Sequence, residues 1–290
     1  MNNQDNEKVF QKSQINWYPG HMAKAKREIK EKLEYIDIVY EVIDARMPIS
    51  SKIIDLDDLI GNKKRIIVVT KYDLCDKEKT NEILKVYKDK YPVIIFNLKE
   101  NCKNEIKELI LKTNDLLKDI NESRKIKGLK PRVYRAIVIG APNVGKSTLI
   151  NRISGKNSLK TGNRAGVTKG LSWIKVSNTI ELMDTPGLLY PKIEDKEVGL
   201  TLASFSSINE DILDKEEITK YIIKYLYDNY KDKLENRYHI KITDNDVEKI
   251  ILAIAESTKC YLKSEIDYNR VYTIILNDLK EGRISNITIK

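Results

Sequence analysis

The stretch GAPNVGKST, from Gly140 to Thr148, constrains the fold of this chain more than any other part of its 290 residues. It follows YRAIVIG (134–140), an apolar run typical of a buried strand, and it opens a segment with helical spacing. A Gly-x4-Gly-Lys-Ser/Thr loop in that context binds phosphates, because its backbone N–H groups point inward at the positive end of the helix. We therefore expect Lys146 to contact the β- and γ-phosphates of a nucleotide and the Ser147 hydroxyl to bind Mg²⁺. The expected phosphate contacts are Asn143, Val144, Gly145, Lys146, Ser147 and Thr148.

Short apolar, β-branched runs alternate with helical patterns through the first part of the chain. Strands buried on both faces are expected at 37–44, 64–71, 92–97 and 134–140, with helices at 77–90 and 103–120. The pair LSWIKV and TIELMD, separated by Ser177 and Asn178, predicts a hairpin. This alternation indicates an α/β fold with a mostly parallel sheet flanked by helices.

The pattern changes after about Tyr190, where long helical stretches begin. EEITKYIIKYLYDNYKDKLENRY and NDVEKIILAIAESTKCYL carry apolar residues at helical spacing, and Pro191 marks the boundary. We therefore predict two domains, an α/β domain at 1–195 and a helical domain at 196–290.

The motif LMDTPG follows the phosphate loop at the end of the second hairpin strand. Asp184 is placed to hold the hydration shell of Mg²⁺, and the Gly187 N–H to sense the γ-phosphate. Asp-x-x-Gly alone is weak evidence, because many loops contain it. Its distance from the phosphate loop makes the assignment more specific here. Between the two motifs, RAGVTKG supplies Thr168, a candidate to close over Mg²⁺ and the γ-phosphate. The alternative is an ordinary loop threonine.

TKYD, from Thr70 to Asp73, follows a buried strand and resembles the Asn-Lys-x-Asp motif that binds guanine. The carboxylate of Asp73 can accept two hydrogen bonds, from N1–H and the 2-amino group of guanine, that adenine does not offer. GTP is therefore the expected substrate. Lys71 is expected to lay its stem along the base, and Thr70 gives a shorter tether than the usual Asn. Asn97, in IIFNLKEN, lies where the loop behind the base is expected, although it matches that loop poorly.

These motifs occur in the reverse of their usual order, since Asp73 precedes Lys146. A site at a sheet edge needs loops at the carboxyl ends of several strands rather than one chain order. Circular permutation is tolerated where the original termini lie close together. We therefore expect a circularly permuted P-loop GTPase domain, whose last loop leads directly into the helical domain.

The net charge of +9 is concentrated in two segments. Residues 124–135 and 152–180 each carry six basic residues and no acid, which indicates an RNA or DNA partner. The abundant Ile, Lys and Asn are also typical of an AT-rich genome, which weakens that inference.

Other sequence features favour a cytoplasmic protein. No apolar run is long enough for a membrane span, and the start, MNNQDNEKVFQKSQ, lacks the apolar region of a secretory signal. The three cysteines lack metal-ligand spacing and are expected to be reduced thiols.

Several motifs together resemble those of the ribosome biogenesis GTPase A family: WYPGHM, DAR, TKYD, KPR, GAPNVGKST, GVT and DTPGLLYPK, in this permuted order. The resemblance is dense from about residue 15 to 200 and thinner beyond. It implies a bacterial GTPase that acts in late maturation of the large (50S) ribosomal subunit, with the immature subunit and its rRNA as partners. It also implies rRNA contact by the helical domain and stimulation by K⁺, with Asn143 as a ligand. No membrane partner is expected, and the lack of a coiled-coil seam favours a monomer.

Leu188 occupies the position where Ras-like GTPases place the glutamine that orients the attacking water. A leucine side chain cannot hydrogen-bond water. The family's proposed substitute is the histidine of its Pro-Gly-His motif, here His21, whose imidazole can orient water or move a proton near neutral pH. The resemblance thus makes His21 a catalytic candidate beside Lys146 and Thr168. The alternative is a histidine that caps the helix expected after it.

Two other functions fit parts of the sequence. A GTPase of another RNA process, such as tRNA modification, would share the phosphate and guanine motifs but does not usually have the permuted order. A non-hydrolysing RNA-binding scaffold would use the nucleotide site as a structural latch, and the intact Lys146, Ser147 and Asp184 argue against it.

Overall fold

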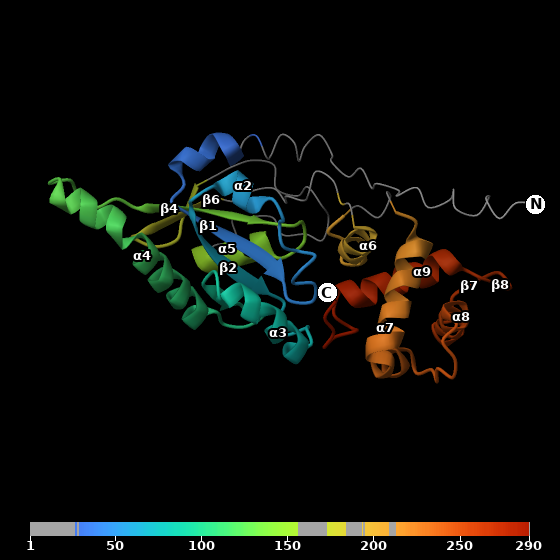
Figure 1. Cartoon of the computed structure of the whole chain (residues 1–290). Coiled ribbons are helices and arrows are strands. Elements are labelled where there is room, and N and C mark those ends of the chain that lie inside the picture. Colours follow the sequence, from blue (N-terminus) through green and yellow to red (C-terminus); the bar gives the residue numbers. More distant parts are fainter. Residues whose placement is uncertain are drawn as a thin grey trace, which may run out of the picture.

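The computed structural model describes residues 27, 29–155, 173–183, 193, 195–208 and 213–289. Within them lies a six-stranded sheet with the order β3-β2-β1-β4-β6-β5 (Figure 1). Its neighbouring strands are parallel except for the β5–β6 hairpin. The strands are β1 (Ile38–Asp44), β2 (Lys64–Thr70), β3 (Val93–Ile95), β4 (Tyr134–Gly140), β5 (Trp173–Lys175) and β6 (Ile180–Met183). The predicted mostly parallel sheet and its hairpin are confirmed.

Helices flank this sheet on both faces, as the alternating pattern predicts. They are η1 (Leu33–Tyr35), α2 (Leu56–Ile60), α3 (Lys77–Lys88), α4 (Lys103–Ile126) and α5 (Lys146–Ser154). Val42 and Ile43 are neighbours on β1 but enter two different hydrophobic clusters, because successive strand residues point to opposite faces. Leu84 of α3 packs in the cluster of Ile43, and Leu149 of α5 lies in the cluster of Val42.

The parallel register brings the carboxyl ends of three central strands to one edge. Asp44 at the end of β1 pairs with Thr70 at the end of β2, and Val42 pairs with Gly140 at the end of β4. A Cβ on Gly140 would lie 2.4 Å from the backbone oxygen of Val42, so this close approach requires glycine. The loops that follow the three strands therefore start side by side.

The described residues from 195 onward are mainly helical, as predicted. They form α6 (Lys196–Ser204), α7 (Lys215–Tyr238), α8 (Val247–Ser257), α9 (Tyr268–Lys280) and a short hairpin of β7 (Tyr261–Leu262) and β8 (Glu265–Ile266). An aspartate caps each of the four helices by accepting hydrogen bonds from first-turn N–H groups. Among the described helices, none combines the length and apolar character that a membrane crossing requires.

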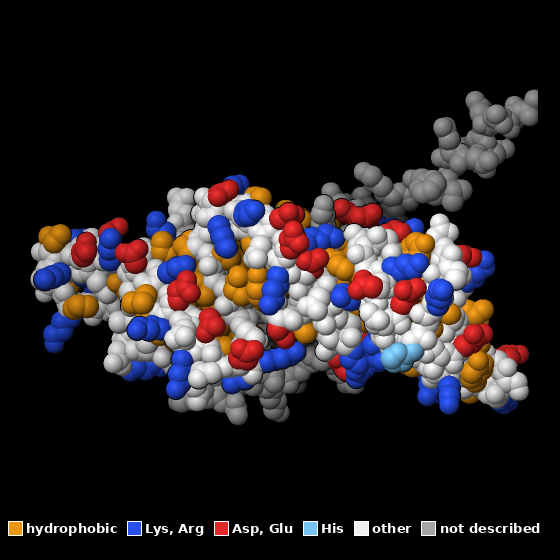
Figure 2. All heavy atoms as spheres, turned by 90° about the horizontal axis from the view of Figure 1, so that it is seen from below, with side chains coloured by type: hydrophobic (Ala, Val, Ile, Leu, Met, Phe, Trp, Pro, Cys, Tyr) orange, Lys and Arg blue, Asp and Glu red, His pale blue; other side chains and the backbone are white. Residues whose placement is uncertain are grey.

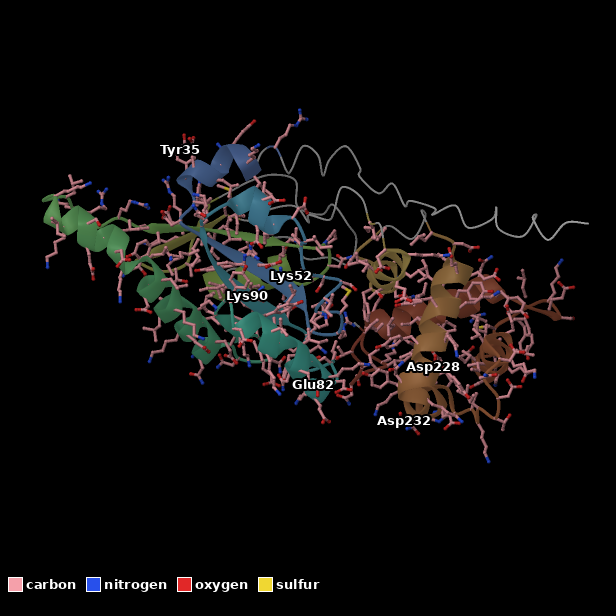
Figure 3. The ribbon with its side chains drawn as sticks, viewed as in Figure 1. Tyr35, Lys52, Glu82, Lys90, Asp228 and Asp232 are labelled. Carbon is pink, nitrogen blue, oxygen red and sulfur yellow. The ribbon has the colours of Figure 1, made fainter. Side chains whose placement is uncertain are left out.

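The helical region is in direct contact with the sheet region. Lys79 of α3 donates to the Tyr225 hydroxyl of α7 at 2.9 Å. Figure 3 shows α3, which carries Glu82, near α7, which carries Asp228 and Asp232. The boundary between residues 195 and 196 stays a prediction.

Candidate nucleotide-binding site

The predicted phosphate loop joins β4 to α5. Gly145 has a φ of 100°, which disfavours any other residue, and it directly precedes the first helical residue, Lys146. Lys146 is buried, and its Nζ donates to the carbonyl oxygens of Gly140 (3.1 Å) and Ala141 (2.8 Å). These bonds hold the ammonium over the start of the loop, at the positive end of α5, where phosphates bind. Ser147 is half-buried in the first turn of the same helix.

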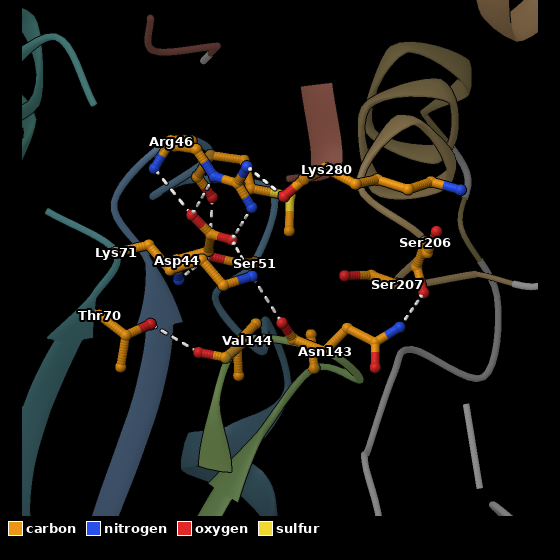
Figure 4. Close-up of polar contacts among 12 residues, drawn as sticks. Asp44, Arg46, Ser51, Thr70, Lys71, Asn143, Val144, Ser206, Ser207 and Lys280 are labelled. Carbon is orange, nitrogen blue, oxygen red and sulfur yellow. Dashed lines mark hydrogen bonds and ion pairs between the residues drawn. The ribbon is translucent and has the colours of Figure 1, made fainter. Parts of the chain in front are cut away.

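Thr70 fastens the guanine motif to the phosphate loop. Its Oγ1 lies 2.5 Å from the carbonyl oxygen of Val144 and 3.1 Å from that of Ile43. A hydroxyl has one proton to donate, so the shorter contact is the hydrogen bond. The side chain is fully buried. The shorter tether predicted for this threonine thus reaches the loop backbone directly (Figure 4).

Lys71 also contacts the phosphate loop, from a backbone with φ 55°. Its Nζ donates to the Asn143 carbonyl oxygen at 2.7 Å and pairs with Asp44 Oδ2 at 2.9 Å. Burial would raise the pKa of Asp44, but the neighbouring Arg46 and Lys71 outweigh it and hold the pKa well below its usual range. Burial lowers the pKa of Lys71, and the Asp44 carboxylate opposes that change. The Lys71 ammonium is thus held by Asp44 against the backbone of the phosphate loop.

Arg46 extends this network to the helical region. Its guanidinium binds both oxygens of Asp44, with Nε to Oδ1 at 3.1 Å and Nη2 to Oδ2 at 2.9 Å. Its Nη1 donates to the carbonyl oxygens of Leu279 (2.8 Å) and Lys280 (3.2 Å), at the C-terminus of α9. Its Cζ lies 4.3 Å from the ring centre of Phe205. Polar contacts therefore run from the phosphate loop through Lys71, Asp44 and Arg46 to α9 (Figure 4).

A second contact to the phosphate loop comes from the segment after α6. The Asn143 side-chain amide donates to the Ser206 carbonyl oxygen at 2.6 Å, and the Ser207 hydroxyl donates to the Pro142 carbonyl oxygen at 2.8 Å. Asn143 adopts a φ of 60°. The helical region thus touches the loop that is expected to hold the phosphates.

Asp73 lies in the loop after β2, where its Oδ2 pairs with Lys99 Nζ at 2.9 Å. Lys99 belongs to the loop after β3, which also contains Asn97. The Asn97 side-chain oxygen accepts from the Lys99 backbone N–H at 3.4 Å. In the same loop, the Leu98 Cδ1 lies 3.4 Å from where a Cβ on Gly145 would be, so this loop packs against the phosphate loop.

The structure therefore brings together the loops of ten predicted residues: Thr70, Lys71, Asp73, Asn97, Asn143, Val144, Gly145, Lys146, Ser147 and Thr148. Four others lie outside the described residues: His21, Thr168, Asp184 and Gly187. Asp44 and Arg46 were not among the site residues predicted from the sequence. The signal was present in EVIDAR, since Asp44 is an acid at the end of β1 and Arg46 is a base just after it.

The described residues contain no group of three or more His, Cys, Asp or Glu side chains that could hold a metal ion alone. Mg²⁺ in nucleotide sites is usually bound by one or two protein oxygens together with the substrate phosphates. The Ser147 hydroxyl, at the positive end of α5, fits that arrangement.

Comparisons with known proteins place this chain among GTPases. A family model described as 50S ribosome-binding GTPase matches residues 135–262. The protein "Ribosome biogenesis GTPase A" of Bacillus cereus is 38% identical over 277 residues, 95% of this chain and 93% of that protein. "Probable ribosome biogenesis GTPase A" of Mycoplasma genitalium is 32% identical over 281 residues, 97% of this chain and 98% of that protein.

A solved structure shares the fold. GNP-bound YlqF from T. maritima matches with a TM-score of 0.62 and 23% identity, covering 92% of this chain and 97% of that one. A GDP-bound YlqF structure matches with a TM-score of 0.63. The sequence matches span nearly the whole chain, and its phosphate loop is joined to the predicted guanine motif by Thr70 and Lys71. This chain is a GTPase that belongs to the ribosome biogenesis GTPase A family.

Proposed function

We propose that this GTPase is an assembly factor for late maturation of the large (50S) ribosomal subunit, and that the immature subunit stimulates its GTP hydrolysis. The observation that carries the proposal is the joining of guanine and phosphate motifs through Thr70–Val144 and Lys71–Asn143, in a chain of this family. The net charge of +9 supports rRNA as the partner.

Different residues of this chain bind the base and the phosphates of GTP. Asp73 accepts hydrogen bonds from N1–H and the 2-amino group of guanine. Lys146 and the N-terminus of α5 neutralise the phosphates. Ser147, Thr168 and Asp184 would hold Mg²⁺, which would supply positive charge beside the β- and γ-phosphates.

His21 is the proposed group that orients the attacking water, since Leu188 cannot hydrogen-bond it. In this mechanism, Thr168 and the Gly187 N–H order around the γ-phosphate, and binding to the subunit aligns His21 with the water. His21→Ala should abolish subunit-stimulated hydrolysis and leave GTP affinity unchanged, measured by phosphate release and nucleotide titration. Unchanged stimulated turnover in this variant would reject the role.

The contacts of the phosphate loop support a link between nucleotide state and subunit binding. Asn143 and Pro142 are bonded to Ser206 and Ser207, and Lys71 is bonded through Asp44 to the Arg46 network. We propose that phosphates in the loop change these contacts, so that the GTP form binds the subunit and hydrolysis releases it.

Two experiments together test the proposed function. The first measures phosphate release with and without 50S subunits. The second measures co-sedimentation with subunits in the presence of GDP or a non-hydrolysable GTP analogue. We expect slow turnover alone, faster turnover with subunits, and co-sedimentation that requires the analogue. Equal co-sedimentation with GDP and the analogue would reject the switch. Stimulation by another RNA but not by subunits would indicate a GTPase of another RNA process. A lack of turnover under all conditions would indicate a scaffold.

We also propose K⁺ as an activating ion, with the Asn143 side-chain oxygen as its ligand. Asn143 fits because it lies in the phosphate loop and its amide nitrogen already donates to Ser206, which orients the side chain. Asn143→Ala should remove the difference in hydrolysis rate between K⁺ and Na⁺ buffers. A rate that still depends on K⁺ in the variant would place the ion elsewhere.

Finally, we propose that the protein acts as a monomer in the bacterial cytoplasm. Light scattering coupled to size exclusion should give the mass of one chain, 33.6 kDa, with GDP and with the GTP analogue.

A further inference from the structure

The C-terminal end of α4 projects beyond the sheet, at the left of Figure 1. Residues 124–130 form this end, and we name them the basic tip. Figure 2 shows blue and orange side chains together at the same end of the molecule. We propose that the basic tip is a docking surface for the phosphate backbone of structured RNA, and the ribosomal source of that RNA rests on the proposed function.

The backbone of the basic tip has a fixed shape. Gly128, with φ 69°, ends the helix, and its N–H donates to the Lys125 carbonyl oxygen at 3.0 Å. The Leu129 N–H donates to the Arg124 carbonyl oxygen at 2.9 Å. These two bonds form a Schellman cap, which satisfies carbonyls of the last turn.

Side chains also tie the tip to the return of the chain into β4. Arg124 Nε donates to the Lys130 carbonyl oxygen at 2.9 Å. The Asn121 side chain exchanges two hydrogen bonds with the Arg132 backbone, at 3.0 and 3.1 Å. The Arg132 guanidinium binds both carboxylate oxygens of Asp37, at 2.6 and 2.7 Å. A surface held this way loses little conformational entropy when it binds a partner.

Three exposed lysines of the tip carry charge that the fold does not use. In the part of the chain that the structure describes, the ammonium groups of Lys125, Lys127 and Lys130 have no ion-pair partner. Earlier on the same helix, Lys112 pairs with Glu108 one turn away. Three like charges this close repel one another in the free protein, and a polyanion removes that repulsion.

Apolar side chains lie between these lysines. Ile126 is 87% exposed and Leu129 is 50% exposed. These two side chains add apolar contact area beside the charges of the basic tip. The unpaired lysines, in a stretch from 124 to 135 without an acid, favour RNA over a protein as the partner.

A charge-removal experiment tests the proposal on RNA alone. The variant Lys125→Ala/Lys127→Ala/Lys130→Ala is compared with Lys85→Ala/Lys88→Ala/Lys90→Ala, which removes three exposed lysines near the end of α3 that also lack ion pairs among the described residues. Binding of the full chain to a short RNA duplex is measured across a KCl titration. Each lysine that contacts a phosphate should lower the slope of log affinity against log salt by about 1. A slope lower by about 2 to 3 corresponds to roughly 100-fold to 1,000-fold weaker binding at about 0.1 M salt, if the curves meet near 1 M.

We expect this loss for the tip variant and a change under about threefold for the α3 variant, because only the tip is proposed to contact phosphates. GTP hydrolysis without subunits should be unchanged in both, which shows that the fold is kept. Equal RNA affinity and slope in the two variants would overturn the proposal.

Co-sedimentation with 50S subunits separates this proposal from the proposed function. If wild type binds subunits and the tip variant binds equally well, the tip proposal fails and the proposed function stands. If wild type does not bind subunits but binds RNA through the tip, the proposed function fails and the tip proposal stands. If Ile126→Ser/Leu129→Ser abolishes subunit binding while the lysine variant retains it, the partner is a protein and the RNA proposal is overturned.

Discussion

At the scale of single residues, Thr70 stands where Asn is usual in the predicted guanine motif, and its hydroxyl holds the phosphate loop. The sequence predicts the motif, because TKYD follows a buried strand. It does not predict the contact, since Val144 lies 74 positions away and only the sheet order brings the two together. Asp44 and Arg46 were missed for the same reason, because Lys71 lies in the loop after β2 and the carbonyl oxygens that Arg46 binds lie at the end of α9.

Removal of the Thr70 hydroxyl should weaken both the fold and nucleotide binding. Thr70→Val keeps the shape but leaves the buried Val144 carbonyl without its donor, which costs about 1–3 kcal/mol of unfolding free energy. GTP and GDP affinity should fall together, because the loop loses its tether to the guanine motif. Urea unfolding and nucleotide titration measure both effects. Thr70→Ser, which keeps the hydroxyl, is the control, and equal behaviour of the two variants would show that the bond is unimportant.

At the scale of elements, type was easier to predict than extent. The central strands were identified because burial on both faces makes them mostly apolar; in β1 all seven residues are buried and only Glu41 and Asp44 are charged. Helix α4 continues to Ile126, beyond the predicted end at residue 120, because its end is set by the cap at Gly128 rather than by its apolar stripe. The β7–β8 hairpin was not predicted, since strands of two residues have no readable periodicity.

The end of α9 depends on Arg46, and this gives a prediction about acid stability. Arg46 and Lys71 lower the pKa of Asp44 in the folded state. The ionised Asp44 therefore adds to the free energy of unfolding at pH values above the unfolded pKa of about 3.9, and this stabilisation is lost as the pH falls below that value. Arg46→Lys keeps the charge but cannot bind both Asp44 oxygens and the α9 carbonyls. We expect the variant to be less stable at pH 7 by about 1–3 kcal/mol.

The variant should also lose less stability than wild type between pH 5 and pH 3, because a smaller part of its stability depends on the ionised Asp44. Urea unfolding at pH 7, 5 and 3 measures these differences, and hydrogen exchange in α9 gives a local readout. Arg270→Lys, at an exposed site on α9, is the matched control. An Arg46→Lys protein with the stability curve of the control would contradict the role of the network.

At the scale of the whole molecule, the segment 284–289 joins the helical region to the sheet region. Thr288 Oγ1 lies 2.7 Å from Thr80 Oγ1 and accepts from the Asp76 N–H at 3.1 Å. The Thr288 carbonyl oxygen accepts from the Tyr225 hydroxyl at 3.0 Å. ISNITI has neither helical nor clear strand spacing, and its partner Asp76 lies 212 positions away, so this role could not be predicted.

The two regions should therefore unfold together only while this segment is in place. Deletion of residues 284–290 removes the Thr288 bonds and the buried Ile284, Ile287 and Ile289, so calorimetry should show two transitions in place of one. The milder Thr288→Val leaves the partly buried Asp76 N–H without its acceptor and should lower the unfolding free energy by about 1–3 kcal/mol. Thr288→Ser keeps the hydroxyl and should behave as wild type. A deleted protein that still unfolds in one transition at the wild-type midpoint would show that the α3–α7 contact and the Arg46 network suffice to couple the regions.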